Sequence, residues 1–327
     1  MKEHSCQEQI HILTEYSQKI QWEKELRFLW KSCFGDPQYY EDFYFDKVYA
    51  DNKVYAIKDK GMIHLNFYRC KVMGKDVELP YIVGVATNEN CRRQGIMRSL
   101  LEQVLFDLNE QRVPFAYLMP ANEEYYKPFG FQSVSEKAEC EIWMKDAERT
   151  SRFRYLSYEE FKKLSSKVQA QLREEINQWL EQRYDVYAVH DEAYYELLYA
   201  EKKCQNGNVV FCFDGVVDVK SLYGMFAYAM DGNIPYVEQM VLKEKDAQDL
   251  PRMAGLIASF FAECDSVKLV QSYPYMFRII NRNAFVELFE EKCSDVAGFA
   301  ITDSMTCDEM IEHLFIGKDS VYFAEIV

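Results

Sequence analysis

A short polar loop between two apolar segments carries the first chemical signal in this sequence. The loop NENCRRQG follows an apolar strand that ends at Thr87 and leads into a helix with an apolar stripe from Ile96. Backbone N–H groups at the start of a helix have no partner within the helix, so they form an anion site. Gly95 lets an anion approach the backbone closely, while Arg92 and Arg93 add positive charge. We therefore expect a pyrophosphate group here, against the alternative of an ordinary strand–helix loop with solvated arginines.

A second group of polar and aromatic residues follows the next short apolar strand. It contains Asn122, the adjacent Tyr125 and Tyr126, and the dipeptide Gly130-Phe131. Taken singly, these residues have structural explanations: Asn122 as a helix N-cap, the tyrosines as core aromatic residues, and Gly130 as a helix C-cap. The residue types alone leave both structural and chemical roles open.

Taken together, the two segments resemble the signature motifs of the GCN5-related N-acetyltransferase (GNAT) superfamily. The loop reads Arg92-x-x-Gly95-x-Met97, where the family has Gln/Arg-x-x-Gly-x-Gly/Ala, so methionine replaces a residue that is usually small. The later segment is similar to the family's signature of an Asn followed by Tyr-x-x-x-Gly-Phe. Asn122 matches the Asn, and Tyr126 matches the Tyr. The resemblance is specific over the first part of the chain and loose beyond it.

The resemblance implies a coenzyme A thioester held along one strand and at the start of the following helix. The strand from Val83 to Thr87 is expected to pair with the pantetheine arm, with an N–H near Val85 or Ala86 on the thioester oxygen. The residues implied to bind the cosubstrate, acetyl-CoA, are Val85, Ala86, Thr87, Arg92, Arg93, Gln94, Gly95, Ile96, Met97, Arg98 and Asn122.

The resemblance also implies the reaction, which is transfer of an acetyl group from acetyl-CoA to a primary amine by direct attack. Tyr126 is implied to protonate the departing thiolate, because a phenol with a pKa near 10 is protonated at neutral pH. In similar enzymes the terminal carboxylate of the chain enters the active site, so Val327 is a candidate general base. Glu123 and Glu124 are other available carboxylates. The acceptor implied is a small-molecule or peptide amine.

Two other classes of function compete with this enzyme. A CoA-sensing or partner-binding module with weak catalysis would keep the pyrophosphate loop and lose turnover, although the presence of both the loop and Tyr126 favours the enzyme. Nucleotide binding is disfavoured because neither G-x-x-x-x-G-K-[ST] nor G-x-G-x-x-G occurs in the sequence.

Composition narrows the class of protein and the kinds of partner. The formal net charge of −15 over 327 residues, without a basic patch, disfavours nucleic acid as a partner. No segment is apolar and long enough to cross a bilayer, and ten cysteines without C-x-x-C spacing are typical of reduced thiols, so we expect a cytoplasmic protein. The five histidines have no metal-ligand spacing, so no metal is expected. The sequence is compatible with a homo-oligomer.

Hydrophobic periodicity predicts the elements that position these residues. In the first part of the chain these are helices at 22–34 and 37–48, strands at 53–57, 62–72 and 77–87, a helix at 96–108, a strand at 115–119, a short helix at 121–129 and a hairpin at 131–144. The second part repeats this order loosely, with helices around 158–184 and 191–203, strands at 209–213, 221–230 and 235–242, a helix at 250–263 and a strand at 267–272.

This order predicts a mixed α/β fold: an N-terminal GNAT domain with a mixed, mostly antiparallel sheet, followed by a degenerate GNAT-like copy. The predicted domains are residues 1–148, which bind acetyl-CoA, residues 149–290, and a C-terminal tail of residues 291–327. This organisation resembles the enhanced-intracellular-survival type of tandem acetyltransferase. The second copy is not expected to bind coenzyme A, since residues 243–249 before its helix contain acidic side chains and no glycine.

Overall fold

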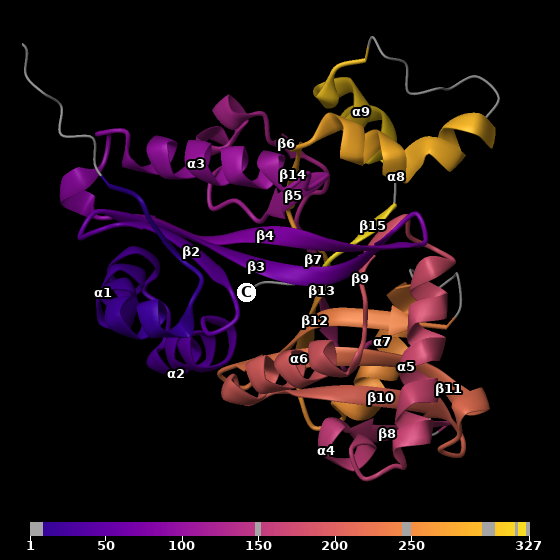
Figure 1. The fold of residues 1–327 in the computed structure, drawn as a ribbon. Coiled ribbons are helices and arrows are strands. Elements are labelled where there is room, and N and C mark those ends of the chain that lie inside the picture. Colours follow the sequence, from indigo (N-terminus) through magenta and orange to yellow (C-terminus); the bar gives the residue numbers. More distant parts are fainter. Residues whose placement is uncertain (1–8, 148–151, 244–249, 296–304, 318–319, 325–327) are drawn as a thin grey trace, which may run out of the picture.

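Two mixed sheets with helices against their faces make up the molecule (Figure 1). The structure is a computed structural model that describes residues 9–147, 152–243, 250–295, 305–317 and 320–324. None of the helices in these ranges is both long and apolar enough to span a bilayer.

The first part of the chain folds largely as its periodicity predicts. Its helices are α1 (Tyr16–Phe34), α2 (Gln38–Phe43), which continues as a π-helical turn (Tyr44–Val48), and α3 (Ile96–Glu110). Its strands are β1 (His11–Leu13), β2 (Lys53–Ile57), β3 (Gly61–Val72), β4 (Lys75–Thr87), β5 (Phe115–Leu118), β6 (Gln132–Ser133) and β7 (Ala138–Trp143). The helices and strands predicted between 22 and 119 are confirmed, and β1 is an addition.

Three details differ from the predictions for this part. Helix α1 starts earlier than predicted, since Glu15 and Gln18 form a capping box. Pro37, predicted in the first turn of α2, is instead its N-cap. The short helix predicted at 121–129 is two 3-10 turns, Glu123–Tyr125 and Lys127–Phe129, because Pro128 cannot donate a helical hydrogen bond.

The second part of the chain supplies the other elements. Its helices are α4 (Tyr158–Phe161), α5 (Ser166–Glu181), α6 (Glu192–Cys204), α7 (Leu250–Phe260), α8 (Arg282–Asp295) and α9 (Cys307–Leu314). Its strands are β8 (Phe153–Ser157), β9 (Val186–Ala188), β10 (Asn208–Asp214), β11 (Leu222–Asp231), β12 (Ile234–Leu242), β13 (Ser266–Ser272), β14 (Met276–Ile279) and β15 (Val321–Tyr322). The elements predicted between 158 and 272 are confirmed, with the first helical segment divided into α4 and α5.

The strand order divides the elements between a nine-stranded and a six-stranded sheet. The larger sheet runs β1-β2-β3-β4-β5-β14-β6, with β9 paired to β3 and β15 paired to β9. The smaller sheet runs β7-β13-β12-β11-β10-β8. In Figure 1, α3 covers the upper face of the larger sheet, while α1, α2 and the smaller sheet lie beneath it.

The two sheets share a local pattern, as expected for a repeated fold. Each contains one parallel pair, β4 with β5 and β12 with β13, among antiparallel neighbours. In each sheet an antiparallel strand follows the parallel pair: β14 lies beside β5, and β7 lies beside β13. This common pattern agrees with the loose repeat seen in the sequence.

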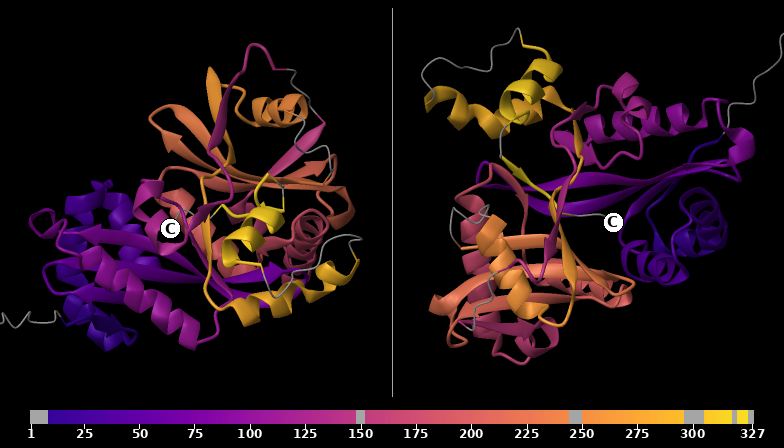
Figure 2. Two further views of the ribbon diagram at one scale, coloured as in Figure 1. Left: turned by 90° about the horizontal axis from the view of Figure 1, so that it is seen from above. Right: turned by 180° about the vertical axis from the view of Figure 1, so that it is seen from behind.

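The hairpin predicted at 131–144 is wrong, because its two strands belong to different sheets. Strand β6 pairs with β14, whereas β7 pairs with β13. The two halves of the chain thus exchange strands, and the views in Figure 2 show β7 among strands of the second half. The predicted domain limits of 1–148, 149–290 and 291–327 stay a prediction, and residues 148–151 at the first limit lie outside the described residues.

The larger sheet has a different core on each face. Leu100, Leu101 and Val104 of α3 pack on one face, together with Ile82 and Leu118. The opposite face is covered by α1 and α2 at one end and by an aromatic cluster at the other. Strand β4 lies between these cores.

Candidate functional site

Strand β4 carries a one-residue bulge near its end. The register of its pairing with β3 shifts between Met62 and His64, so β4 has one residue more than β3 over this interval. Gly84 in this interval has a φ of 59°, and a Cβ atom there would lie 2.7 Å from a ring carbon of Trp30. Glycine is therefore required, and the bulge sits directly against α1.

Strands β4 and β5 separate just before this bulge. They pair in parallel at only two positions, the second of which is Ile82 opposite Leu118. Strand β5 then ends, while β4 continues to Thr87 without a strand partner on that side among the residues that are described. The predicted cofactor residues Val85, Ala86 and Thr87 lie in this unpaired stretch. Their backbone groups can pair with an extended ligand in place of a neighbouring strand.

The loop that follows β4 presents backbone N–H groups at an open helix end. A 3-10 turn capped by Asn88 leads to Arg93 and Gly95, which have φ of 62° and 85°. Helix α3 then begins without a side-chain cap and without an acidic residue in its first turn. Because a Cβ atom on Gly95 would meet nothing within 4 Å, space above the helix start is open. These are the features of an anion site.

The predicted side chains divide into exposed and packed groups. Arg92, Arg93, Gln94 and Arg98 are exposed, while Ile96 is buried in the core beneath α3. Met97 is half-buried and packs against that same core.

The exposed arginines make few contacts within the chain. Arg92 Nε donates to the Thr87 carbonyl oxygen at 3.4 Å, and Arg98 pairs with Glu102 at 3.2 Å. Arg93 makes no ion pair with another described residue. The guanidinium groups of Arg92 and Arg93 are thus available to a bound anion.

The two tyrosines that the sequence could not separate have different surroundings. Tyr126 is 7% exposed and belongs to the core between α3 and the sheet, with its ring edge-on to Phe131. Burial raises the pKa of Tyr126 to about 12. Tyr125 is 58% exposed. Of these two tyrosines, only Tyr126 therefore has a buried side chain.

The capping interpretations of the neighbouring residues are confirmed. The side chain of Asn122 accepts a hydrogen bond from the backbone N–H of Glu124 at 3.0 Å, as an N-cap does. Gly130 closes the second 3-10 turn with φ of 76°. Neither observation tests whether Asn122 contacts a cofactor.

The end of the described chain returns to the separation of β4 and β5. Strand β15 is followed by Phe323, which stacks on Tyr117 of β5 with ring centroids 4.2 Å apart. Tyr117 pairs with Tyr81, one position before the last β4–β5 pair. Val327, predicted as a general base, lies outside the described residues, and so do positions 244–249 of the predicted second-copy loop.

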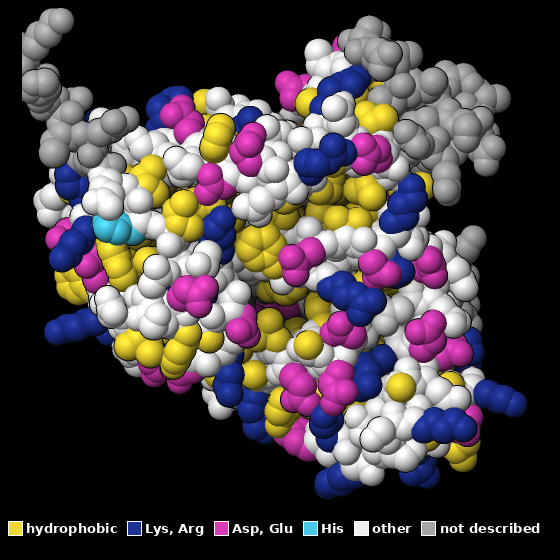
Figure 3. All heavy atoms as spheres, in the orientation of Figure 1, with side chains coloured by type: hydrophobic (Ala, Val, Ile, Leu, Met, Phe, Trp, Pro, Cys, Tyr) yellow, Lys and Arg dark blue, Asp and Glu magenta, His cyan; other side chains and the backbone are white. Residues whose placement is uncertain are grey.

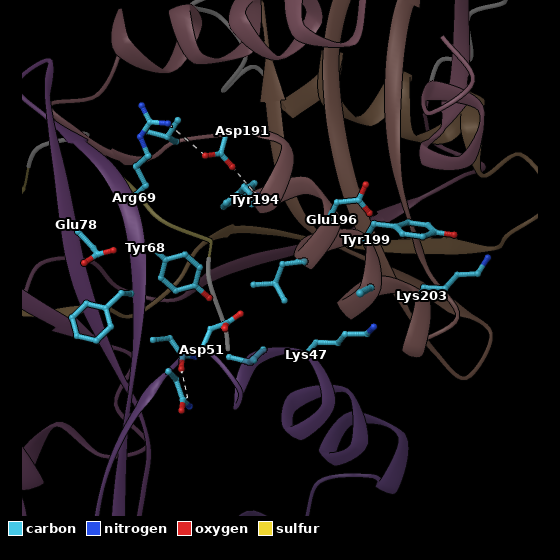
Figure 4. Close-up of a pocket in the computed structure, with 18 of the residues that line it drawn as sticks. Lys47, Asp51, Tyr68, Arg69, Glu78, Asp191, Tyr194, Glu196, Tyr199 and Lys203 are labelled. Atoms are coloured by element: carbon cyan, nitrogen blue, oxygen red, sulfur yellow. Dashed lines mark hydrogen bonds and ion pairs between the residues drawn. The ribbon is translucent and has the colours of Figure 1, made fainter. Parts of the chain in front are cut away.

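A large cavity that the sequence analysis did not predict lies on the other side of β4. It has a volume of about 1040 Å³ and is bounded by β3, the π-helical turn and α6 (Figure 4). Figure 3 shows the same region as a hollow with hydrophobic side chains inside and charged side chains around it. The cavity therefore lies between strand β3 of the larger sheet and helix α6 of the second half of the chain.

A buried polar network forms the floor of this cavity. Asn52 Nδ2 donates to Tyr44 Oη at 3.0 Å and to Asn66 Oδ1 at 3.3 Å. Tyr44 Oη lies 3.0 Å from Nδ1 of His64. Burial lowers the pKa of His64 to about 3, so its ring is neutral. The sequence signal for this network is His64 and Asn66, two polar residues two positions apart in the otherwise apolar first half of β3.

Fold and site together define the class of protein. Residues 18–134 match the family model of the acetyltransferase (GNAT) domain. This part of the chain is therefore a GNAT domain, and both the family resemblance and the mixed α/β fold predicted from the sequence are confirmed.

Similar solved structures extend over most of the chain. A conserved protein from Enterococcus faecalis V583, described as a probable N-acyltransferase, has a TM-score of 0.66 and 16% identity over 85% of this chain and 75% of its own. A GCN5-related N-acetyltransferase from Anabaena variabilis has a TM-score of 0.63 and 16% identity, over 84% and 73%. Eis1 from Mycobacterium abscessus has a TM-score of 0.57 and 13% identity, over 86% and 75%. No curated protein gives a significant match by sequence.

Proposed function

We propose that this chain is an N-acetyltransferase that transfers the acetyl group of acetyl-CoA to a primary amine by direct attack. One observation carries the proposal: the end of β4, which has no strand partner on the β5 side among the described residues, leads through a short loop to the uncapped start of α3. An extended pantetheine arm suits the unpaired strand, and a diphosphate suits the open helix start.

In this proposal the backbone of β4 and the following loop hold the thioester. An N–H near Val85 or Ala86 donates to the thioester oxygen and stabilises the negative charge that develops there during attack. The amide groups of the loop bind the diphosphate, and the guanidinium groups of Arg92 and Arg93 add charge-assisted hydrogen bonds.

The reaction then requires two proton movements. The amine nitrogen forms a bond to the acetyl carbon, loses a proton, and the carbon–sulfur bond breaks. Tyr126 is proposed to give its phenolic proton to the departing sulfur, since its raised pKa keeps it protonated. The Val327 carboxylate remains a proposal for the base, supported by the path of the chain toward Tyr117 as far as Ala324.

The first test is binding of coenzyme A, measured by isothermal titration calorimetry. Replacing both Arg92 and Arg93 with alanine should weaken binding by about tenfold or more, because a hydrogen bond to a charged group contributes roughly 1.5–3 kcal/mol. The matched control is Arg154→Ala, an exposed arginine on β8 in the smaller sheet.

Calorimetry tests the cofactor site, and release of thiol tests whether the chain is an enzyme. Absence of heat with coenzyme A, or equal affinity in the wild type and the double variant, contradicts the proposed cofactor site. Binding without release of thiol from acetyl-CoA in the presence of any primary amine would favour a CoA-binding module over an enzyme.

A further inference from the structure

The cavity between β3 and α6 adjoins the strand proposed to hold the thioester. Asn66 on its floor lies directly opposite Tyr81 of β4, one position before the last β4–β5 pair at Ile82. Directly opposed residues of antiparallel strands have Cβ atoms about 4.5–5.5 Å apart. A molecule in the cavity can therefore reach β4 without crossing another element.

Two residues that line the cavity each have a buried side-chain atom without a hydrogen-bond partner among the described residues. Asn52 and Asn66 are only 5% and 4% exposed, and both line the cavity. Within the described chain, Oδ1 of Asn52 and Nδ2 of Asn66 have no hydrogen-bond partner. Leaving such a buried group unpaired costs roughly 1–3 kcal/mol. A ligand that offers both an N–H and a C=O, as an amide does, satisfies both atoms.

One wall of the cavity is an open strand edge. Strand β2 pairs with β3 as far as Leu65, and β9 pairs with β3 from Cys70 onward. The four residues between them, 66–69, all line the cavity. The Arg69 carbonyl accepts from the Val189 N–H at 2.8 Å, and backbone groups of alternate residues face the same edge. Those of Phe67 therefore face this edge too, between the ends of β2 and β9.

The charged residues of the cavity have both signs. The lining includes three basic side chains and four acidic ones. The basic residues are Lys47, Arg69 and Lys203, and the acidic residues are Asp51, Glu78, Asp191 and Glu196. Figure 4 shows that they come from both walls, Lys47 and Asp51 from the first part of the chain and Glu196 and Lys203 from α6. Lys47 and Asp51 have no ion-pair partner in the ranges that are described. A site for simple polyamines would have carboxylates without these lysines and arginine.

We propose that this cavity is the acceptor site and that it takes a peptide, bound through its main-chain amide groups at Asn52, Asn66 and the open edge of β3. The inference rests on the proposed acetyl transfer and names its substrate class. Main-chain pairing gives affinity to peptides of different sequence, and the mixed charges around the cavity tolerate zwitterionic ones. The amine to be acetylated then extends from the bound segment toward β4.

The test compares three acceptors that each carry a primary amine. These are the tripeptide Gly-Lys-Gly, the same tripeptide with methyl groups on its backbone amide nitrogens, and cadaverine, which has the amine without amides. Thiol release from acetyl-CoA gives kcat/KM for each. We expect kcat/KM for the tripeptide to exceed that for both others by about tenfold or more, since methylation removes the backbone N–H donors and cadaverine has none.

A variant locates the effect in the cavity. Asn66→Leu should raise KM for the tripeptide about tenfold while leaving the calorimetric affinity for coenzyme A unchanged. The control is Lys24→Met, an exposed residue of α1 that does not line the cavity. If Asn66→Leu fails to fold, as judged by its circular dichroism, the acceptor series alone decides.

The inference and the proposed function fail in different ways. Equal kcat/KM for the tripeptide and its methylated form, or a preference for cadaverine, overturns the peptide site and leaves acetyl transfer standing. If no acceptor releases thiol, the proposed function fails, and calorimetric titration of the tripeptide decides the site. Heat with the tripeptide and none with the methylated form supports it, whereas no heat with either overturns it.

Discussion

Tyr126, which we propose as the proton donor, and Tyr125 are neighbours in sequence but differ in their surroundings. Tyr126 is enclosed by apolar residues beneath α3, and Tyr125 faces outward. Because burial disfavours the ionised phenolate, the pKa of Tyr126 rises to about 12.

We predict that Tyr126→Phe lowers kcat by about 100-fold or more, the usual contribution of a general acid. Coenzyme A affinity should stay within about twofold of the wild type, because the phenol is assigned to proton transfer. Initial rates of thiol release and calorimetry measure the two quantities. Tyr125→Phe is the matched control and should leave both unchanged; equal rates in Tyr126→Phe and the wild type would remove the assignment.

Apart from Val327, the candidate site residues predicted from the sequence lie in two motifs close together along the chain. Val85 to Arg98 form one continuous strand, loop and helix start, so a motif can identify them. Asn52 and Asn66 meet because β2 and β3 pair with Lys53 opposite Leu65, which makes these two residues the next opposed pair. The residues of α6 on the other wall of the cavity lie far along the chain, so this part of the site required the folded structure.

At the level of elements, α6 is joined to β12 through a buried charged cluster. Lys202 is 1% exposed, and its ammonium lies 2.8 Å from Glu201 and 2.5 Å from Glu238 of β12. Burial alone would lower the pKa of Lys202, but the two carboxylates raise it above its ordinary value. Lys202 thus holds the carboxylates of Glu201 and Glu238 together near the C-terminal end of α6, the helix that forms one wall of the cavity.

We predict that Lys202→Met lowers the free energy of unfolding by about 3–5 kcal/mol, because it leaves buried carboxylates without their cation. Urea denaturation followed by circular dichroism measures this quantity. The adjacent Lys203→Met provides the control, since Lys203 is exposed and its ion pair with Glu159 contributes about 1 kcal/mol or less. Similar losses in the two variants would contradict a special role for the buried lysine.

Periodicity predicted most elements correctly but did not predict which strands would pair. The alternation in β7 indicates a strand, and a short connection from β6 favours a hairpin. The structure instead places β7 beside β13, since the apolar face of β7, with Ile142, completes the core under α7. Strand partners far apart in sequence depend on packing, which a local pattern does not contain.

At the level of the whole molecule, the exchange of β7 and β14 should keep the two halves together even without a covalent link. We predict that a protease site inserted at the junction 148–151 can be cut without separating the halves. Size-exclusion chromatography before and after cleavage measures this, with the uncut protein as control. Elution of two smaller species under native conditions would contradict the role given to the exchanged strands.

The exchange also affects the order in which the chain can mature during synthesis. The edge of β5 that receives β14 is complete once Leu118 has been made, but its partner begins at Met276. At translation rates of about 5–20 residues per second, the ribosome needs on the order of ten to thirty seconds for the intervening segment. During that interval an apolar strand edge is open to other nascent chains, so we expect the newborn polypeptide to depend on chaperones.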